Sequence, residues 1–529
     1  MRSFASRVNL GSTVAGPSRT TLAWLAGAVA LLLAAWLSPR AVPFNMDELV
    51  HYHALGCATA PLARELPLIR DGCGYHDLRL SFTDAFLPLR SYVYIGSFPS
   101  LPFYPFFLLL DAPVAARVQG AVFFLLFVLL AARLLRARAS SVVLAALVFP
   151  VLLATFLVDE GPVGLSAVLF LAALLAVRRA LGAAASRAAA GWAALAALLL
   201  FLGLWTKLLF AWWLPVAAGF ALAEARRRAG SWPAALRAHG AAALAGVVTL
   251  ALPTLLLLTA VDREGRPYVS VLRYGGMKAE AEEVQASAGR LLPYLVDGAR
   301  VAPRNVALPA SLLDPLPLAV AGALLVLGLR RARPGTAAWA AAAALTLALA
   351  SLSRHSQWPH HFAFPLLPLV LALALALDVA GRRARAAVAL LVVLFWASLA
   401  ARWPAATFPR ESSPAKDELL AAVRARGLDR GSVQLHASWG TYYIAQLFGD
   451  RDRMLVYMRG APDDPERLEA VRDVARAHRR KVLLFSSRRW ERTQTPQVEK
   501  VLGRPQATWS YGQWWAVEYD PLRSASPRP

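Results

Sequence analysis

The stretch Gly120-Ala-Val-Phe-Phe-Leu-Leu-Phe-Val-Leu-Leu-Ala-Ala132 decides the fold class of this chain. It belongs to an apolar run, residues 113–134, that is long enough to cross a bilayer as a helix. Similar runs recur along the sequence, and 57% of the 529 residues are hydrophobic. We expect a polytopic α-helical membrane protein with about eleven transmembrane helices. The expected spans are 21–38, 113–134, 141–158, 161–177, 191–206, 208–223, 240–260, 311–329, 336–353, 362–379 and 386–402.

The first of these spans resembles a secretion signal, because Arg2, Arg7 and Arg19 precede it. Its apolar core is long for that role, and many further spans follow it. We therefore interpret residues 21–38 as an uncleaved anchor.

Arginines gather in alternate loops between the spans, while nearly all acidic residues fall in the other loops. This alternation follows the positive-inside rule, and it predicts a cytoplasmic N-terminus and an extracytoplasmic C-terminus. The net charge of +23 is therefore explained without a nucleic-acid partner. The clusters are Arg133, Arg136 and Arg138; Arg178, Arg179 and Arg187; Arg226, Arg227 and Arg228; Arg330, Arg331 and Arg333; and Arg382, Arg383 and Arg385.

The composition changes to that of a soluble domain after about residue 403. Apolar runs at 433–435, 454–457 and 482–485 alternate with helical patterns at 415–426, 440–448 and 464–479, which predicts a small α/β layer. We expect a transmembrane catalytic domain over residues 1–402, with a long first outer loop at 39–112. An extracytoplasmic α/β domain over 403–522 and a disordered tail at 523–529 complete the expected organisation.

Ionisable residues are almost absent from the middle of the spans and collect at their expected outer ends. A transporter would be expected to bury such groups near the bilayer centre, so this distribution favours an enzyme that works at the membrane surface. An acidic pair, Asp47-Glu48, stands in the stretch Pro43-Phe-Asn-Met-Asp-Glu-Leu-Val-His-Tyr-His53 directly after the first span, where it has no packing role. The other residues at these ends are Asp159, Glu160, Lys207, Arg354, His355, His360 and His361.

Each of these residues also has a structural interpretation. Lys207 is at the tip of a hairpin between two spans, where it is either a snorkelling anchor or a cation placed to bind a lipid phosphate. Asp159 and Glu160 either mark the end of a span or bind substrate. The histidines lack a metal-ligand spacing, so no metal site is predicted, although a divalent ion that assists the reaction stays possible in principle.

The cysteines, Cys57 and Cys73, both fall in the first outer loop. In an oxidising compartment they are expected to form a disulfide, which would stabilise the loop by about 3 kcal/mol. Two free thiols are the alternative.

Several motifs in order along the chain resemble those of the GT-C glycosyltransferases, in the branch that contains the protein O-mannosyltransferases and the lipid A aminoarabinose transferase. The resemblance covers about residues 20–400, and it rests on the order of the motifs and their shared side rather than on any one of them. The motifs are Asp47-Glu48, Leu101-Pro-Phe-Tyr-Pro105, Phe156-Leu-Val-Asp-Glu160, Gly203-Leu-Trp-Thr-Lys207 and His361-Phe-Ala-Phe-Pro-Leu-Leu-Pro368.

The resemblance implies an enzyme of the bacterial cytoplasmic membrane that takes a sugar from a polyprenyl-phosphate carrier on the outer face and transfers it with inversion. Asp47 would be the general base and Glu48 would orient it or contact the sugar. Lys207, with Arg354 or the histidines, would neutralise the leaving phosphate, and Asp159 would hold the acceptor or a sugar hydroxyl.

The acceptor is a glycan, a lipid or a protein. The Arg-rich signature that protein mannosyltransferases carry before their second acidic site is missing, which makes a protein the less favoured acceptor. The alternatives to such a transferase are an oligosaccharide ligase or polymerase of surface polysaccharide, and a non-enzymatic membrane scaffold for envelope assembly.

Overall fold

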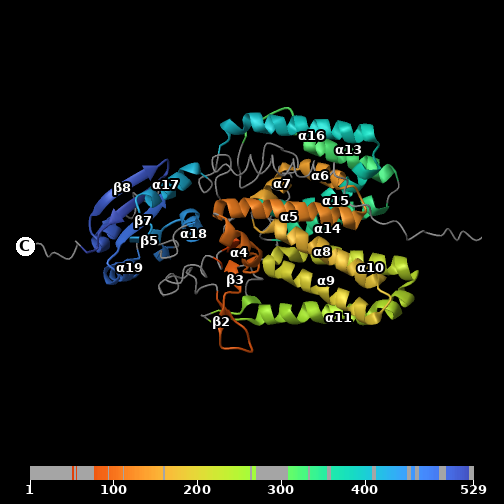
Figure 1. Cartoon of the computed structure of the whole chain (residues 1–529), viewed down its shortest axis with the longest axis horizontal. Coiled ribbons are helices and arrows are strands. Elements are labelled where there is room, and N and C mark those ends of the chain that lie inside the picture. The colour runs from red at the N-terminus through yellow and green to blue at the C-terminus, as the bar shows by residue number, and fades with distance from the viewer. Residues whose placement is uncertain are drawn as a thin grey trace, which may run out of the picture.

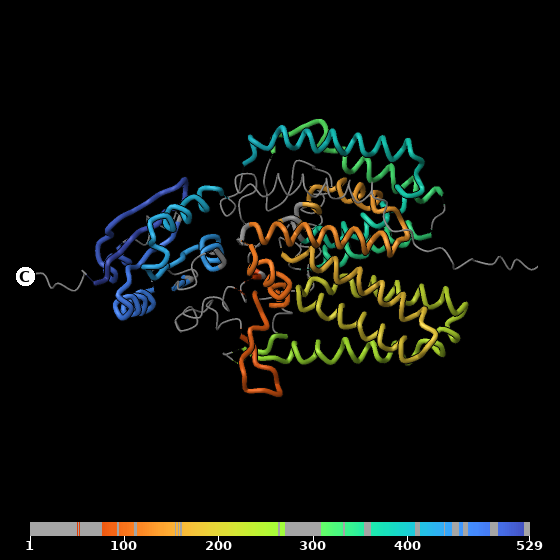
Figure 2. Tube along the Cα trace, viewed as in Figure 1, coloured from red at the N-terminus to blue at the C-terminus, as the bar shows by residue number. Residues whose placement is uncertain are grey.

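The computed structural model describes residues 50–52, 55, 77–92, 95–110, 112–158, 161–262, 265–269, 308–331, 334–353, 359–407, 413–448, 454–458, 464–487 and 496–522. Within these residues the chain forms a bundle of long, roughly parallel helices with a β-sheet beyond one end of the bundle (Figures 1 and 2). The expected span 21–38 and the expected tail 523–529 lie outside the described residues.

The bundle consists mainly of apolar helices. Seven stretches among the described residues are long and apolar enough to cross a membrane: Val114–Leu135, Val163–Gly182, Ser186–Thr206, Leu208–Ala229, Trp232–Thr259, Pro334–Leu352 and Arg382–Ala405. They correspond to α5 (Ala112–Leu135), α8 (Val163–Gly182), α9 (Ser186–Thr206), η3 (Leu208–Trp213) with α10 (Leu214–Ala229), α11 (Trp232–Thr259), α14 (Pro334–Leu352), and α16 (Arg382–Arg402) with η6 (Trp403–Ala405).

The expected span 141–158 is two short helices, α6 (Ala139–Leu147) and α7 (Pro150–Leu157), rather than one. Pro150 has no N–H to continue the α-helical ladder and its ring crowds the preceding turn, but it is well suited to the first position of a new helix. The break between α6 and α7 is therefore a local consequence of the sequence.

Two further expected spans are shorter than the seven. They are α13 (Leu316–Arg330), of 15 residues, and α15 (Ala363–Val379), of 17. Nearly every residue of α15 is buried, and it packs against α6, α13 and α14. A helix that is apolar all round is expected at the centre of a bundle, which is where α15 lies.

The described arginines of the clusters gather at one end of the bundle, which we call the arginine end. Arg178 donates from Nη1 to the carbonyl oxygen of Leu134 at 2.6 Å, which ties the end of α8 to that of α5. Arg331 likewise donates from Nη1 to the carbonyl oxygen of Val379 at 2.6 Å, which ties α13 to α15. Grouping of the basic loops on one side is what the alternating charge pattern predicts.

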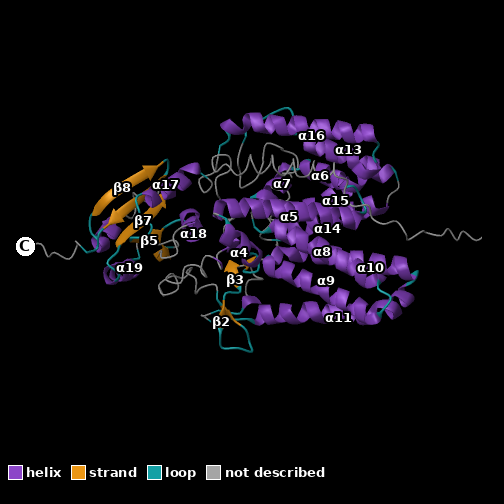
Figure 3. Ribbon diagram, viewed as in Figure 1, coloured by secondary structure: helices purple, strands orange, loops and turns teal. Residues whose placement is uncertain are grey.

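The opposite end, which we call the sheet end, carries short irregular elements of the first loop. These are η1 (Val50–Tyr52), β1 (Leu78–Arg79), β2 (Phe86–Leu87), β3 (Arg90–Tyr92), β4 (Ile95–Gly96) and α4 (Ser100–Leu109). β1 pairs with β2 and β3 with β4, both antiparallel. Figure 3 shows that the strands lie at this end and in the neighbouring sheet.

The C-terminal segments form a five-stranded sheet in the order β6-β5-β7-β9-β8. β5 (Ser432–His436) pairs in parallel with β6 (Met454–Tyr457) and β7 (Lys481–Ser487), whereas β9 (Trp514–Tyr519) is antiparallel to β7 and β8 (Pro505–Tyr511). The apolar runs predicted as strands are thus β5, β6 and β7.

Helices cover both faces of this sheet. Successive residues of β7 alternate between the faces: Val482 and Leu484 pack with α19 (Pro465–Ala477), and Leu483 and Phe485 with α17 (Pro414–Ala425). This is the alternation that a strand buried on both faces requires.

Helix α18 (Trp439–Phe448) joins the sheet to the bundle. Tyr442, Ile444 and neighbouring residues of α18 share one apolar cluster with Tyr52, with Phe103 of α4 and with Ala115 of α5. The C-terminal sheet is therefore packed directly against the first loop.

Candidate active site

Lys207 is the site residue that the structure describes most fully. Helix α9 ends at Thr206, Lys207 adopts an extended conformation, and η3 begins at Leu208, so the lysine is at the hairpin tip that the sequence predicts. Its side chain is 0% exposed. A snorkelling lysine would carry its amine to the surface. The complete burial of Lys207 is therefore inconsistent with the anchor interpretation.

The first loop packs against the hairpin that carries Lys207. Gly96 of β4 lies so close to Trp205 that a Cβ on Gly96 would be 1.9 Å from the Trp205 carbonyl oxygen. Trp205 Nε1 also donates to the carbonyl oxygen of Leu89, the residue before β3, at 2.8 Å. These contacts fix the β3–β4 hairpin beside the end of α9.

The histidine segment contacts η3, the second arm of the hairpin that carries Lys207. His361, in η5 (Pro359–Phe362), is buried, and its ring is edge-on to Trp212 of η3 with centroids 6.3 Å apart. Trp213 Nε1 donates to the Phe364 carbonyl oxygen at 3.0 Å. Because η5 also packs against α7, the structure brings His361 between Lys207's hairpin and the helix that precedes Asp159-Glu160.

The segment that directly follows Asp47-Glu48 is also held at this end. Tyr52 is fully buried, and its ring stacks on Phe103 of α4 with centroids 3.9 Å apart. Gln119 of α5 donates from Nε2 to the Tyr52 hydroxyl at 2.5 Å. η1 contacts β3 as well, which links this segment to the β3–β4 hairpin and through it to Trp205.

Several predicted site residues lie outside the described residues: Asp47, Glu48, Asp159, Glu160, Arg354 and His355, together with Cys57, Cys73 and the side chain of His360. The described segments next to these residues nevertheless form a continuous set of contacts at the sheet end. η1 contacts β3, whose hairpin packs against Trp205, and η5 contacts both α7 and Trp212, so these segments are linked to the hairpin that carries Lys207. Among the described residues, no group of three or more histidine, cysteine, aspartate and glutamate side chains could hold a metal ion.

The structure adds buried charges that the sequence interpretation missed. Arg90 of β3 is 6% exposed and lies 4.0 Å from Asp262, which also accepts from Arg266 Nε at 3.1 Å. Arg117, near the start of α5, is 3% exposed. Both arginines lie at the sheet end, opposite the arginine clusters. This departure from the positive-inside pattern was the sequence signal that could have identified them as candidate site residues.

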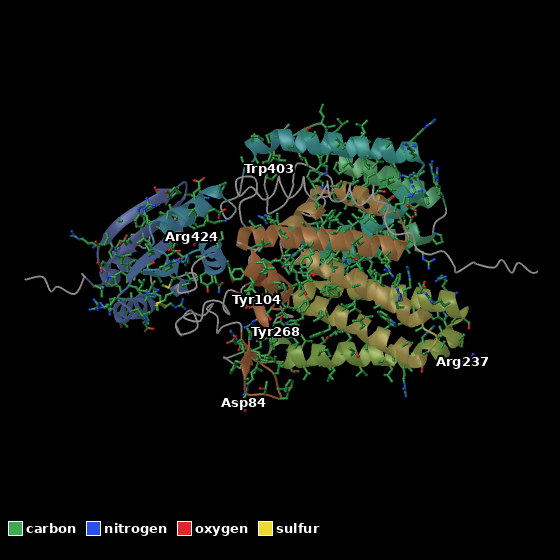
Figure 4. All side chains as sticks on the ribbon, in the orientation of Figure 1. Asp84, Tyr104, Arg237, Tyr268, Trp403 and Arg424 are labelled. Atoms are coloured by element: carbon green, nitrogen blue, oxygen red, sulfur yellow. The ribbon has the colours of Figure 1, made fainter. Side chains whose placement is uncertain are left out.

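Burial also determines the ionisation of Tyr268, which packs with Leu78 next to this charged group. Burial raises the pKa of the Tyr268 phenol well above its usual range, and the nearby Arg90 only partly offsets the effect. Tyr268 is therefore a neutral hydroxyl at physiological pH. Figure 4 shows Tyr268, Tyr104, Asp84 and Trp403 at the sheet end, with Arg237 at the arginine end.

This arrangement of helices is similar to that of ArnT from Cupriavidus metallidurans. The crystal structure of ArnT from Cupriavidus metallidurans bound to undecaprenyl phosphate matches with a TM-score of 0.58 and 14% sequence identity, over 97% of this chain and 100% of that one. ArnT in the apo state matches with a TM-score of 0.52 and 15% identity, over 96% and 100%. The apo oligosaccharyltransferase of Archaeoglobus fulgidus gives a TM-score of 0.43 and 13% identity, over 91% and 72%.

No protein-family model matches the sequence, and no curated protein matches it significantly. The similarity to ArnT is accordingly one of fold.

Proposed function

We propose that this chain is an integral-membrane glycosyltransferase that moves a sugar from a polyprenyl-phosphate carrier to an acceptor on the outer face of the cytoplasmic membrane. The observation that carries the proposal is the complete burial of Lys207 at a hairpin whose neighbouring residues contact the first loop and η5. It is supported by a fold shared along almost the whole chain with ArnT, which was crystallised with undecaprenyl phosphate.

In the proposed reaction, the Asp47 carboxylate removes the proton from an acceptor hydroxyl, and the acceptor oxygen attacks the anomeric carbon of the sugar. The bond from that carbon to the phosphate oxygen breaks, with inversion, and the lipid phosphate leaves. Glu48 orients Asp47 or contacts the sugar. Asp159 and Glu160 hold the acceptor or a sugar hydroxyl.

The cationic side of the site stabilises the departing phosphate. The Lys207 ammonium is removed from water, so its attraction to a phosphate is stronger than at an exposed position. Arg354, His355, His360 and His361 complete this side. A glycan or lipid is the favoured acceptor over a protein.

Complementation tests the proposal. The gene is deleted in its host, the wild type or Asp47→Asn is restored at equal membrane levels, and envelope glycans and lipids are compared by mass spectrometry. We expect one sugar-sized mass to disappear on deletion and to return only with the wild type. Asp84→Asn is the matched control, because Asp84 is an exposed carboxylate of the same loop that pairs only at the surface with Arg79.

If Asp47→Asn restored the full profile, Asp47 would not be the general base, and a membrane scaffold would be the better account. A deletion that changes polymer length, but no single sugar addition, would instead favour a ligase or polymerase.

A further inference from the structure

A groove formed by α10, the turn that follows it and the first residue of α11, which we call the α10–α11 groove, lies far from the candidate active site. Its volume is about 700 Å³, and its lining includes Gly219, Leu222, Arg226, Arg227, Gly230 and Trp232. The groove is at the arginine end, where the tip of the α10–α11 hairpin points away from the sheet (Figure 1). It is therefore separate from the site proposed for sugar transfer.

The charged side of the groove has an excess of positive charge. Arg227 donates from Nε and Nη2 to the two carboxylate oxygens of Glu224, at 3.0 and 2.7 Å, and Arg228 donates from Nε to Oε1 at 2.9 Å. Arg226 instead places its guanidinium 5.6 Å from the centre of the Trp232 ring. The carboxylate of Glu224 thus pairs with two of these three arginines, and Arg226 and Arg227 remain exposed at the groove.

Apolar side chains lie next to this charge. Leu222, which lines the groove, is 55% exposed. Outside the lining, Leu236 follows Trp232 by one turn on the same face of α11 and is 72% exposed. Further along α11, Leu244 and Val247 are also exposed. Beside Gly219 there is open space, because no atom lies within 4 Å of a Cβ built there. The groove therefore combines cations, an aromatic ring and an apolar side chain, and exposed apolar residues of α11 continue beyond it.

We propose that the α10–α11 groove binds an anionic phospholipid, with the phosphate at Arg226 and Arg227 and an acyl chain against Leu222 and Leu236. Tryptophan and arginine are suited to the headgroup level, and basic pockets between helices at the membrane surface select anionic headgroups. A soluble phosphate compound would contact the arginines but not Leu222 or the exposed apolar residues of α11. A phospholipid can contact both, with its phosphate at the arginines and its acyl chain at the apolar residues.

Native mass spectrometry of the purified full-length chain tests the proposal. The protein in detergent is titrated with phosphatidylglycerol, with phosphatidylcholine of the same acyl chains and with inorganic phosphate. We expect phosphatidylglycerol to remain bound at collision energies that remove phosphatidylcholine, and excess inorganic phosphate to leave it bound. Displacement by inorganic phosphate, or equal retention of the two lipids, would overturn the proposal.

Variants locate the lipid in the groove. Arg226→Gln leaves the Glu224 contacts intact and should weaken binding about fivefold, the usual effect of one basic residue at an anionic surface. Gly219→Leu fills the open space without changing charge and should also weaken binding. Arg237→Gln is the control, because Arg237 is an exposed arginine of α11 outside the lining (Figure 4).

The expected result is that binding by Arg237→Gln stays within twofold of the wild type. If Arg237→Gln weakened binding as much as Arg226→Gln did, or if Gly219→Leu had no effect, the lipid would be held by diffuse charge rather than by the groove. Neither outcome depends on whether the chain transfers a sugar.

Discussion

Lys207 is the residue at which burial and charge bear most directly on the proposed chemistry. A fully buried ammonium next to a phosphate is worth much more than an exposed one, because little water screens the interaction. Replacing Lys207 by methionine keeps similar bulk and removes the charge. We expect Lys207→Met to lower product formation by about 10²-fold or more, as loss of one preorganised group does elsewhere. The measurement is product per unit of membrane-inserted protein.

Lys416→Met is the matched control for that experiment. Lys416 is also 0% exposed, but it lies on α17 beside the C-terminal sheet and pairs with Asp417 at 3.8 Å. Its replacement tests the cost of losing a buried lysine away from the site. Full product from Lys207→Met, or equal losses from the two variants, would contradict a phosphate-binding role for Lys207.

Tyr52 is predicted to position the segment that carries Asp47. Tyr52→Phe keeps the stack on Phe103 but removes the hydroxyl that accepts from Gln119. A buried amide that loses an acceptor costs about 1–3 kcal/mol, whereas replacing both partners by apolar groups is close to neutral. We expect Tyr52→Phe to reduce the turnover rate about tenfold with little change in KM, and the double variant Tyr52→Phe/Gln119→Leu to recover most of it.

The informative comparison is between the single and the double variant at equal protein levels. Recovery in the double variant would show that the loss comes from the broken pair. A double variant that is as slow as the single one, or a single variant with wild-type turnover, would exclude the positioning role.

His436 makes the stability of the C-terminal sheet depend on pH. It is fully buried, with Nδ1 3.0 Å from Thr441 Oγ1 and Nε2 3.2 Å from Gln434 Oε1, and burial lowers its pKa to about 3. Between that value and the unfolded pKa of about 6.5, the unfolded chain binds the extra proton. The free energy of unfolding should therefore be highest above pH 6.5 and fall by about 2 kcal/mol on acidification from pH 7 to pH 5.

Thermal unfolding of the purified protein at pH 7 and pH 5 measures this effect. His436→Phe removes the titrating group, so its unfolding temperature should differ less between the two pH values, even though the variant loses both hydrogen bonds. An equal acid-induced decrease in the wild type and His436→Phe would assign the pH dependence to other groups.

At the scale of elements, the β3–β4 hairpin and the end of α9 form one unit through Gly96. A Cβ at residue 96 would overlap the Trp205 carbonyl oxygen at 1.9 Å, so backbone must move. We expect Gly96→Ala to destabilise the protein by about 1–3 kcal/mol, as overpacking does, and to reduce activity because Lys207 lies two residues after Trp205. The unfolding temperature and product formation are the measurements.

Gly246→Ala is the control, since a Cβ there would meet its nearest neighbour, the Ala193 carbonyl oxygen, at an ordinary 3.6 Å. We expect it to leave stability unchanged or slightly higher, because alanine favours a helix. A Gly96→Ala protein as stable and active as Gly246→Ala would show that the hairpin can separate from α9 without consequence.

The elements also show what a sequence can and cannot predict. The hairpin tip at Lys207 and the strands β5, β6 and β7 follow from local apolar runs and turns, so their prediction was correct. The break at Pro150 has an equally local cause. The prediction of one continuous span over 141–158 was wrong because it followed the apolar run and disregarded the proline. The burial of Lys207 was not predictable, because it depends on how distant segments pack around the hairpin. Asp47, Glu48, Asp159 and Glu160 stay predictions, as does the count of about eleven spans.

At the scale of the whole molecule, the C-terminal sheet is held against the segment next to Asp47. Helix α18 places Ile444, which is buried, in the cluster that contains Tyr52 and Phe103. The same helix follows β5 directly, and Thr441 of α18 bonds to His436 of that strand. The sheet is thus coupled to the first loop through α18, and we expect it to contribute to the order of the site.

This coupling predicts that Ile444→Asp reduces product formation without unfolding the sheet. A carboxylate in the apolar cluster is costly to bury, so α18 should separate from α4 and α5, while β7 keeps its partners in the sheet. Ile444→Leu is the control, since a similar volume costs little. Hydrogen exchange should increase in η1 and in α4 of Ile444→Asp but stay unchanged in β7. If a chain that ends at Arg402 inserts stably and matches the full-length protein in activity, the sheet does not support the site, and the contacts of α18 serve only to anchor it.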